Sequence, residues 1–138
     1  DARSPMPLLS IVEETCKKAK GQGLKKCGLF GTGFTMRSNF FQDYFNKHGI
    51  SIVVTDEDDR KYLDDKIFSE LAFGVIKDET RKRFLQIVRK MIDEQSIDSL
   101  ILACTELPLI LDKDECGIPF LSTTAIHVES IVEFCLSE

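Results

Sequence analysis

The most constraining feature of the sequence is a short run that is apolar on both faces. Residues 99–103 read SLILA, and the run follows a segment with helical periodicity. A strand without a polar face must be covered on both sides, as in parallel sheets that carry helices on both faces. The run therefore predicts the central strand of an α/β domain.

Strand-like and helix-like segments alternate along the rest of the chain. Short apolar runs bounded by turn residues predict strands at 26–31, 50–54, 99–103 and 118–121. Apolar residues spaced three and four apart predict helices at 6–20, 38–48, 56–72, 78–94 and 104–111, and a last helix, capped by Ser122 or Thr123, that runs to Cys135 or beyond. This order predicts a three-layer α/β fold, with a four-stranded parallel sheet, right-handed crossovers and helices on both faces.

Length and charge restrict the function classes. A chain of 138 residues predicts one domain, 1–138, and the net charge of −5 argues against binding nucleic acid through bulk charge and against a polybasic membrane anchor. No apolar run approaches 18 residues, so we expect no membrane span. The first residue is Asp1 rather than Met, and we expect a piece of a longer protein or a processed product.

The cysteine pattern indicates a reducing compartment. The five cysteines, an odd number, form no C-x-x-C motif and stand at positions 16, 27, 104, 116 and 135. Cysteines inside apolar periodic segments act as small hydrophobes. We therefore expect a cytoplasmic protein and no structural zinc site.

Ligands of open parallel sheets bind beyond the carboxyl ends of the strands. The segment after the first strand, GTGFT at 31–35, lacks the third glycine of a dinucleotide fingerprint and has Met36 in its place. Its hydroxyls and backbone N–H groups suit a carboxylate or phosphate at a helix N-terminus. The alternative is that Thr35 merely caps its helix, and both interpretations stay open.

Cys104 follows the central strand and precedes a predicted helix. A helix N-terminus lowers a thiol pKa, so Cys104 is the one cysteine placed to act as a nucleophile or in proton transfer. The alternative is a buried cysteine that only packs. In the last helix, His127 could hydrogen-bond Glu106 or polarise the thiol, or support the fold. Lys77, between two helices, is by position a solvated linker charge.

Four motifs together resemble the aspartate/glutamate racemase family. In family order and spacing they are KCGLFGTGFTM at 26–36, GVIKDE at 74–79, LACTELP at 102–108 and TTAIH at 123–127. The resemblance covers the later part of such a racemase, its C-terminal lobe and returning last helix. The preceding N-terminal lobe is absent from this sequence.

The resemblance implies racemisation of acidic amino acids without pyridoxal phosphate or metal. Two cysteines act on opposite faces of the substrate Cα, one as general base and one as general acid. Cys104 matches the second catalytic cysteine, and Lys77 matches a lysine near the side-chain carboxylate. Glu106 and His127 match supporting residues, and the groups that line the substrate correspond to Thr32, Thr35, Thr105, Thr123 and Thr124. The resemblance also implies a homodimer.

The sequence departs from the family pattern. The Cys-Asn-Thr turn that carries the first catalytic cysteine is missing, Ser122 stands in place of Asp, Ala103 in place of Gly, and Gly33 in place of a bulkier residue. Three functions follow as hypotheses: part of a two-cysteine racemase that is inactive alone, a single-thiol enzyme similar to arylmalonate decarboxylases, or a non-catalytic binding remnant. The residues do not distinguish aspartate from glutamate.

Overall fold

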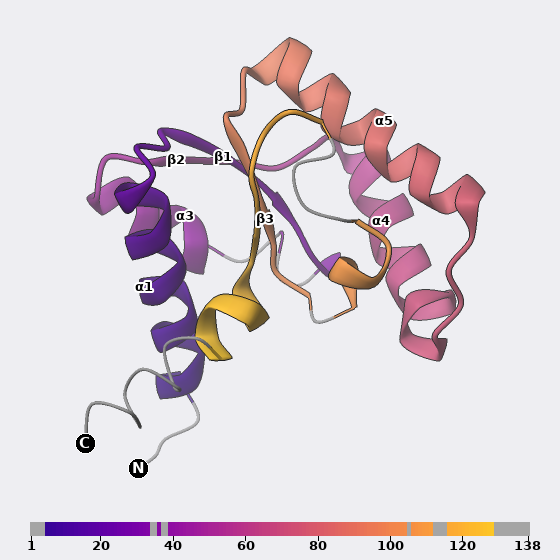
Figure 1. Ribbon diagram of the computed structural model, residues 1–138, viewed down its shortest axis with the longest axis horizontal. Coiled ribbons are helices and arrows are strands. Elements are labelled where there is room, and N and C mark those ends of the chain that lie inside the picture. Colours follow the sequence, from indigo (N-terminus) through magenta and orange to yellow (C-terminus); the bar gives the residue numbers. More distant parts are fainter. Residues whose placement is uncertain (1–4, 34–35, 37–38, 105, 112–115, 129–138) are drawn as a thin grey trace.

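The computed structural model describes residues 5–33, 36, 39–104, 106–111 and 116–128 of the chain (Figure 1). The α-helices are α1 (Pro5–Gly21), α3 (Phe40–Lys47), α4 (Glu57–Ser69) and α5 (Asp78–Gln95). The strands are β1 (Lys26–Phe30), β2 (Ser51–Val53), β3 (Ser99–Leu102) and β4 (Phe120–Ser122), and two 3-10 turns are η1 (Leu71–Phe73) and η2 (Leu107–Leu109). The four strands and the four long helices were all predicted, within a few residues at each end.

The strands form one parallel sheet in the order β2-β1-β3-β4. All four residues of β3 are buried, which confirms that the run apolar on both faces is a central strand. The register places Phe30 beside Leu102 and Leu102 beside Ser122. Three strands therefore end side by side, and the segments that follow them begin at one edge of the sheet.

Each face of the sheet carries its own helices, which confirms the three-layer fold. Cys27 and Leu29 of β1 pack in a cluster with α1 and α3, whereas Phe30 packs in a second cluster with α4 and α5. Successive side chains of a strand point to opposite faces, which explains this alternation. Figure 1 shows α1 and α3 on one side of the sheet and α4 and α5 on the other.

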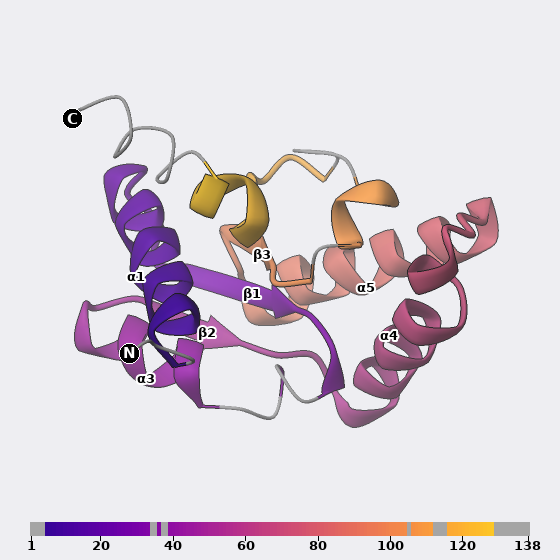
Figure 2. The same ribbon diagram turned by 90° about the horizontal axis from the view of Figure 1, so that it is seen from below.

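Helices α4 and α5 form an antiparallel pair (Figure 2) linked by a buried carboxylate on α4 and half-exposed basic side chains on α5. The Asp59 carboxylate is almost fully buried and accepts a hydrogen bond from Arg83 at 2.8 Å, with Lys90 Nζ 3.5 Å away. Asp56 caps α4 by accepting from the Asp59 N–H at 2.9 Å. Removing Arg83 would leave the buried Asp59 carboxylate with less compensation, so this ion pair links α4 to α5.

Two helix predictions need correction. The helix expected at 104–111 is wrong, because among residues 104 and 106–111 only the three-residue turn η2 forms. Helix α4 ends at Ser69 rather than at residue 72, and a 3-10 turn leads to Gly74, whose φ of 74° is left-handed. The last helix begins at Thr123 as predicted, and Ser122 caps it by accepting from the Ala125 N–H at 3.2 Å. Its extension to Cys135 lies outside the described residues.

No helix in the described part of the chain is both long and apolar enough to cross a membrane.

Candidate active site

Cys104 lies just beyond the carboxyl end of β3. The Ala103 N–H donates to the Phe30 carbonyl at 2.8 Å, which continues the ladder between β1 and β3 up to the residue before the cysteine. The Leu107 N–H then donates to the Cys104 carbonyl at 3.2 Å, and Leu107 is fully buried. The cysteine is therefore held between a central strand and a buried turn, with its side chain half-exposed.

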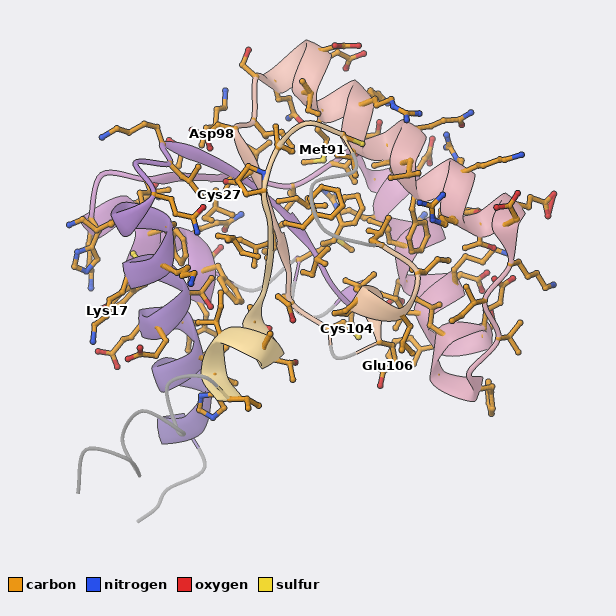
Figure 3. All side chains as sticks on the ribbon, in the orientation of Figure 1. Lys17, Cys27, Met91, Asp98, Cys104 and Glu106 are labelled. Atoms are coloured by element: carbon orange, nitrogen blue, oxygen red, sulfur yellow. The ribbon has the colours of Figure 1, made fainter. Side chains whose placement is uncertain are left out.

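The Cys104 thiol donates a hydrogen bond to Glu106 Oε1 at 3.0 Å. Figure 3 shows the two labelled residues together at the end of β3, with Cys27 at the opposite end of the sheet. Because Cys27 is fully buried and pairs with the first residue of β3, it cannot share a ligand with Cys104.

The prediction that Cys104 has a lowered pKa is wrong. Burial, together with the smaller effect of the Glu106 carboxylate, raises the pKa of the Cys104 thiol to about 11, although backbone N–H groups of Glu106 and Leu107 oppose the shift. The predicted helix N-terminus is absent from this part of the described chain, and a neighbouring carboxylate disfavours the thiolate. Burial also raises the pKa values of Cys16, Cys27 and Cys116.

The segment after β1 is held by a residue that the sequence did not indicate. The Gly33 N–H donates to Asp64 Oδ1 of α4 at 2.6 Å, and the Met36 N–H donates to the Thr32 carbonyl at 3.0 Å. A carboxylate of the protein therefore already binds at the predicted anion-binding loop. Thr35, the alternative cap, lies outside the described residues, as does Thr105.

The start of the last helix lies next to the end of β3. The buried Thr123 hydroxyl donates to the Leu102 carbonyl at 3.3 Å, whereas Thr124 is exposed. His127 Nδ1 is buried and has no hydrogen-bond partner among the described residues. The structure pairs the Cys104 thiol with Glu106 rather than with His127, the partner that the sequence suggested.

Lys77 lies at the tip of the α4–α5 pair, where it forms an ion pair with Glu70. The distance from Lys77 Nζ to Glu70 Oε2 is 3.7 Å, and the lysine side chain is 58% exposed. Glu70 is buried and accepts from Thr80 Oγ1 at 2.7 Å and from Lys66 Nζ at 3.0 Å. The hydrogen bond from Thr80 is the first cause that lowers the pKa of Glu70. Lys77 is thus a mostly exposed lysine that is oriented by a buried carboxylate.

Residues 1–131 match the family of Asp/Glu/hydantoin racemases. The chain belongs to this family. It is 27% identical over 135 residues to the broad specificity amino-acid racemase RacX of Bacillus subtilis (strain 168), covering 96% of this chain and 56% of that one. A crystal structure of a candidate Asp/Glu racemase from Yersinia pestis superposes with a TM-score of 0.84 at 31% identity, over 91% of this chain and 55% of that one.

A second relative is closer to this chain in length. An uncharacterized protein in the pnlA 3' region of Pectobacterium carotovorum subsp. carotovorum is 25% identical over 129 residues, which cover 92% of this chain and 84% of that protein. By contrast, the chain spans about half the length of RacX and of the Yersinia protein.

Proposed function

We propose that this chain is one lobe of a cofactor-independent amino-acid racemase that interconverts L- and D-aspartate or glutamate. In this mechanism one thiolate removes the proton from the substrate Cα, and a second thiol delivers its own proton to the opposite face. Cys104 supplies one of the two thiols. The other comes from a second lobe, as the resemblance to the racemase family implies. The reducing compartment that two free thiols require is the cytoplasm.

The observation that carries this proposal is the placement of Cys104. Its thiol lies beyond a central strand, half-exposed, and its pKa of about 11 keeps it protonated at neutral pH. A protonated thiol at the ligand-binding edge of a parallel sheet suits delivery of a proton to a carbanion. The Thr123 hydroxyl lies at this same edge of the sheet, and the loop after Phe30 begins there.

The proposed substrate class rests on Lys77, which matches the family's lysine near the side-chain carboxylate. An ammonium group that faces the distal carboxylate of aspartate or glutamate contributes about 1.5–3 kcal/mol as a charged hydrogen bond. In an enzyme with both lobes, Lys77→Met should lower kcat/KM for aspartate by about 10- to 100-fold and for alanine far less. Equal losses on the two substrates would show that Lys77 supports only the fold.

Activity of the isolated chain tests the two-lobe mechanism. One thiol reaches one face of the Cα, so the chain alone should form no D-aspartate from L-aspartate in D₂O. Chiral chromatography measures D-aspartate, and the α-proton signal by NMR separately reports exchange on a single face, with Cys104→Ser as the matched control. Formation of D-aspartate by the wild-type chain, but not by Cys104→Ser, would overturn the requirement for a second lobe.

The raised pKa of Cys104 also favours a second candidate, single-thiol protonation. In such an enzyme a carboxylate is lost from an activated malonate, and the thiol proton goes to the resulting enediolate carbon. Release of CO₂ from an arylmalonate by the wild-type chain, absent in Cys104→Ser, would support this candidate over the racemase.

A further inference from the structure

Exposed apolar side chains gather where α4 leads into α5. Phe68, Phe73, Val75 and Ile76 are 59%, 77%, 39% and 49% exposed, and they are four of the seven large apolar side chains that lie exposed in the described part of the chain. We call residues 68–76 the apolar tip. Figures 1 and 2 show the connection between α4 and α5 at the end of the molecule opposite to α1 and α3. Single exposed apolar residues are ordinary on a protein surface, whereas a cluster of them marks a site of interaction.

The apolar tip has a well-defined backbone. The Phe73 and Val75 N–H groups donate to the Glu70 carbonyl at 3.1 and 2.9 Å. Gly74 closes the turn with a left-handed φ of 74°. The Glu70 carboxylate is buried and accepts from Thr80 Oγ1 of α5 at 2.7 Å, which ties the turn to the next helix. An ordered turn therefore displays these apolar side chains, and a partner that covers them has little backbone to order on binding.

The apolar area of the tip is what a small dimer interface requires. A fully exposed Phe presents about 200 Å², so Phe68 and Phe73 together present about 270 Å². Val75 and Ile76 raise the apolar area to about 400 Å² per copy. Two tips packed against each other would bury about 800 Å², which is the apolar share of an interface of about 1,200 Å², because homodimer interfaces are about 65% apolar. A second copy of the tip is therefore large enough to cover the first.

The charges beside the apolar tip also favour a second copy as the partner. The exposed charged residues at 77–82 are two of each sign, Lys77, Asp78, Glu79 and Lys82, whereas the whole chain has a net charge of −5. A twofold axis brings residue i of one copy against residue j of the other and j against i, so a rim with both signs can pair with itself. A strongly acidic or strongly basic partner would meet like charges there.

We propose that the apolar tip is the surface through which two copies of this chain associate about a twofold axis. Asp78 and Lys82 form an ion pair of 3.3 Å within one chain, with side chains 75% and 72% exposed. Such an exposed pair contributes little to stability, so its groups can pair instead with those of the second copy. The rim of an interface stays open to water, which leaves Lys77 accessible to a substrate. The association does not depend on racemase activity.

The test measures self-association of the 138-residue chain. Analytical ultracentrifugation at concentrations up to about 200 µM gives the dimer Kd of wild type, Phe73→Ser and Ile76→Ser. Phe40→Ser is the matched control, because Phe40 is 50% exposed and lies on α3, on the other face of the sheet. Each substitution enters a twofold interface twice, so we expect Kd to rise about 100-fold in Phe73→Ser, at least about tenfold in Ile76→Ser and less than about twofold in Phe40→Ser.

A second measurement locates the interface without a substitution. Amide NMR spectra of the wild-type chain, recorded over the same concentrations, should shift at residues 66–82 and not on α1 or α3. Thermal melting followed by circular dichroism checks that the variants fold, which we expect because both substituted side chains of the tip are exposed.

Three results would overturn the inference. A wild-type chain that stays monomeric at about 200 µM would show that the tip does not bind a second copy and is left for another occupant, such as the second lobe. A dimer that neither tip variant weakens, or shifts confined to other elements, would place the interface elsewhere. Equal weakening by Phe40→Ser would show association without a defined surface. Because no substrate takes part, failure here leaves the proposed function standing, and a chain without racemase chemistry could still dimerise.

Discussion

Removing the negative charge of Glu106 is expected to make Cys104 more reactive. Cys104 Sγ lies 3.0 Å from Glu106 Oε1, and a thiolate there would face a carboxylate. Two unit charges at this distance repel by about 1.4 kcal/mol even with the dielectric constant of water, ~80, which corresponds to about one pKa unit. Glu106→Gln keeps the size of the side chain and removes the charge. The pKa of Cys104, about 11 in the wild type, should therefore fall by at least about one unit in the variant.

The expected rate follows from two opposing effects. At pH 8 the thiolate population rises about tenfold per unit of pKa, but each thiolate becomes less nucleophilic, with a Brønsted coefficient of about 0.4–0.5. The net gain is about threefold per unit. Iodoacetamide labelling followed by peptide mass spectrometry measures the rate at Cys104, and Cys116 in the same molecule is the internal control. An unchanged or slower rate at Cys104 would refute the role assigned to Glu106.

Three further predictions concern stability. Gly28→Ala should lower the free energy of unfolding by about 1–3 kcal/mol in urea denaturation, because the new Cβ would lie 3.0 Å from Ile97 Cδ1 and 3.1 Å from Met91 Cε. Leu63→Ala, at a fully buried position, should cost about 2–5 kcal/mol, and a cost below about 1 kcal/mol would contradict its place in the core. Glu70→Gln should destabilise the protein more at pH 7 than at acidic pH, because the pKa of Glu70 is lowered from its ordinary value of 4.5 in the folded state. The wild-type contribution is present above the unfolded pKa and is lost as the pH falls through the folded pKa, so a loss of stability that stays constant as the pH falls would contradict this.

The sheet and its long helices could be predicted because their signals are local. The apolar run at 99–103 and the helical stripes each specify burial within one segment, and the structure buries Phe84, Ile87, Val88 and Met91 of the stripe on α5. The parallel arrangement then follows from the alternation of elements. The strand order β2-β1-β3-β4 was not predicted, because it depends on contacts between segments.

The segment at 104–111 shows where periodicity stops being informative. Leu107, Ile110 and Leu111 have the spacing of a helix face, and all three are buried. A 3-10 turn presents the same residues to the core over so short a length, and Pro108 is tolerated near its start. Periodicity alone could not distinguish an α-helix from a 3-10 turn in this segment. The error carried over to Cys104, whose lowered pKa had been inferred from a helix that does not form.

The supporting carboxylates could not be predicted for a different reason. Asp64 lies within α4 and Glu70 directly follows its last residue, Ser69, in a segment of many charged residues where an acid ordinarily faces water. What distinguishes them is a partner elsewhere in the chain, the Gly33 amide for one and Thr80 with Lys77 for the other. Both contacts depend on how α4 packs against its neighbours. The spacing of four residues indicates the ion pair of Lys66 with Glu70, but no spacing rule indicates the contacts with Gly33, Thr80 or Lys77.

The proposed chemistry requires a substrate whose charge offsets that of Glu106. Burial and the Glu106 carboxylate keep Cys104 as a thiol, which is the state that donates a proton. Reversible racemisation also needs the same sulfur to remove a proton in the other direction, and a carboxylate 3.0 Å away opposes that state. The negative charge of Glu106 must then be offset when the substrate binds. An α-amino acid carries a positive ammonium group next to the carbon that reacts, whereas an arylmalonate carries none. If the ammonium group offsets the charge of Glu106, Cys104 can act as a base towards an amino acid. Towards a malonate, which has no ammonium group, Cys104 can act only as an acid. The charge of the substrate thus decides in which direction the proton moves.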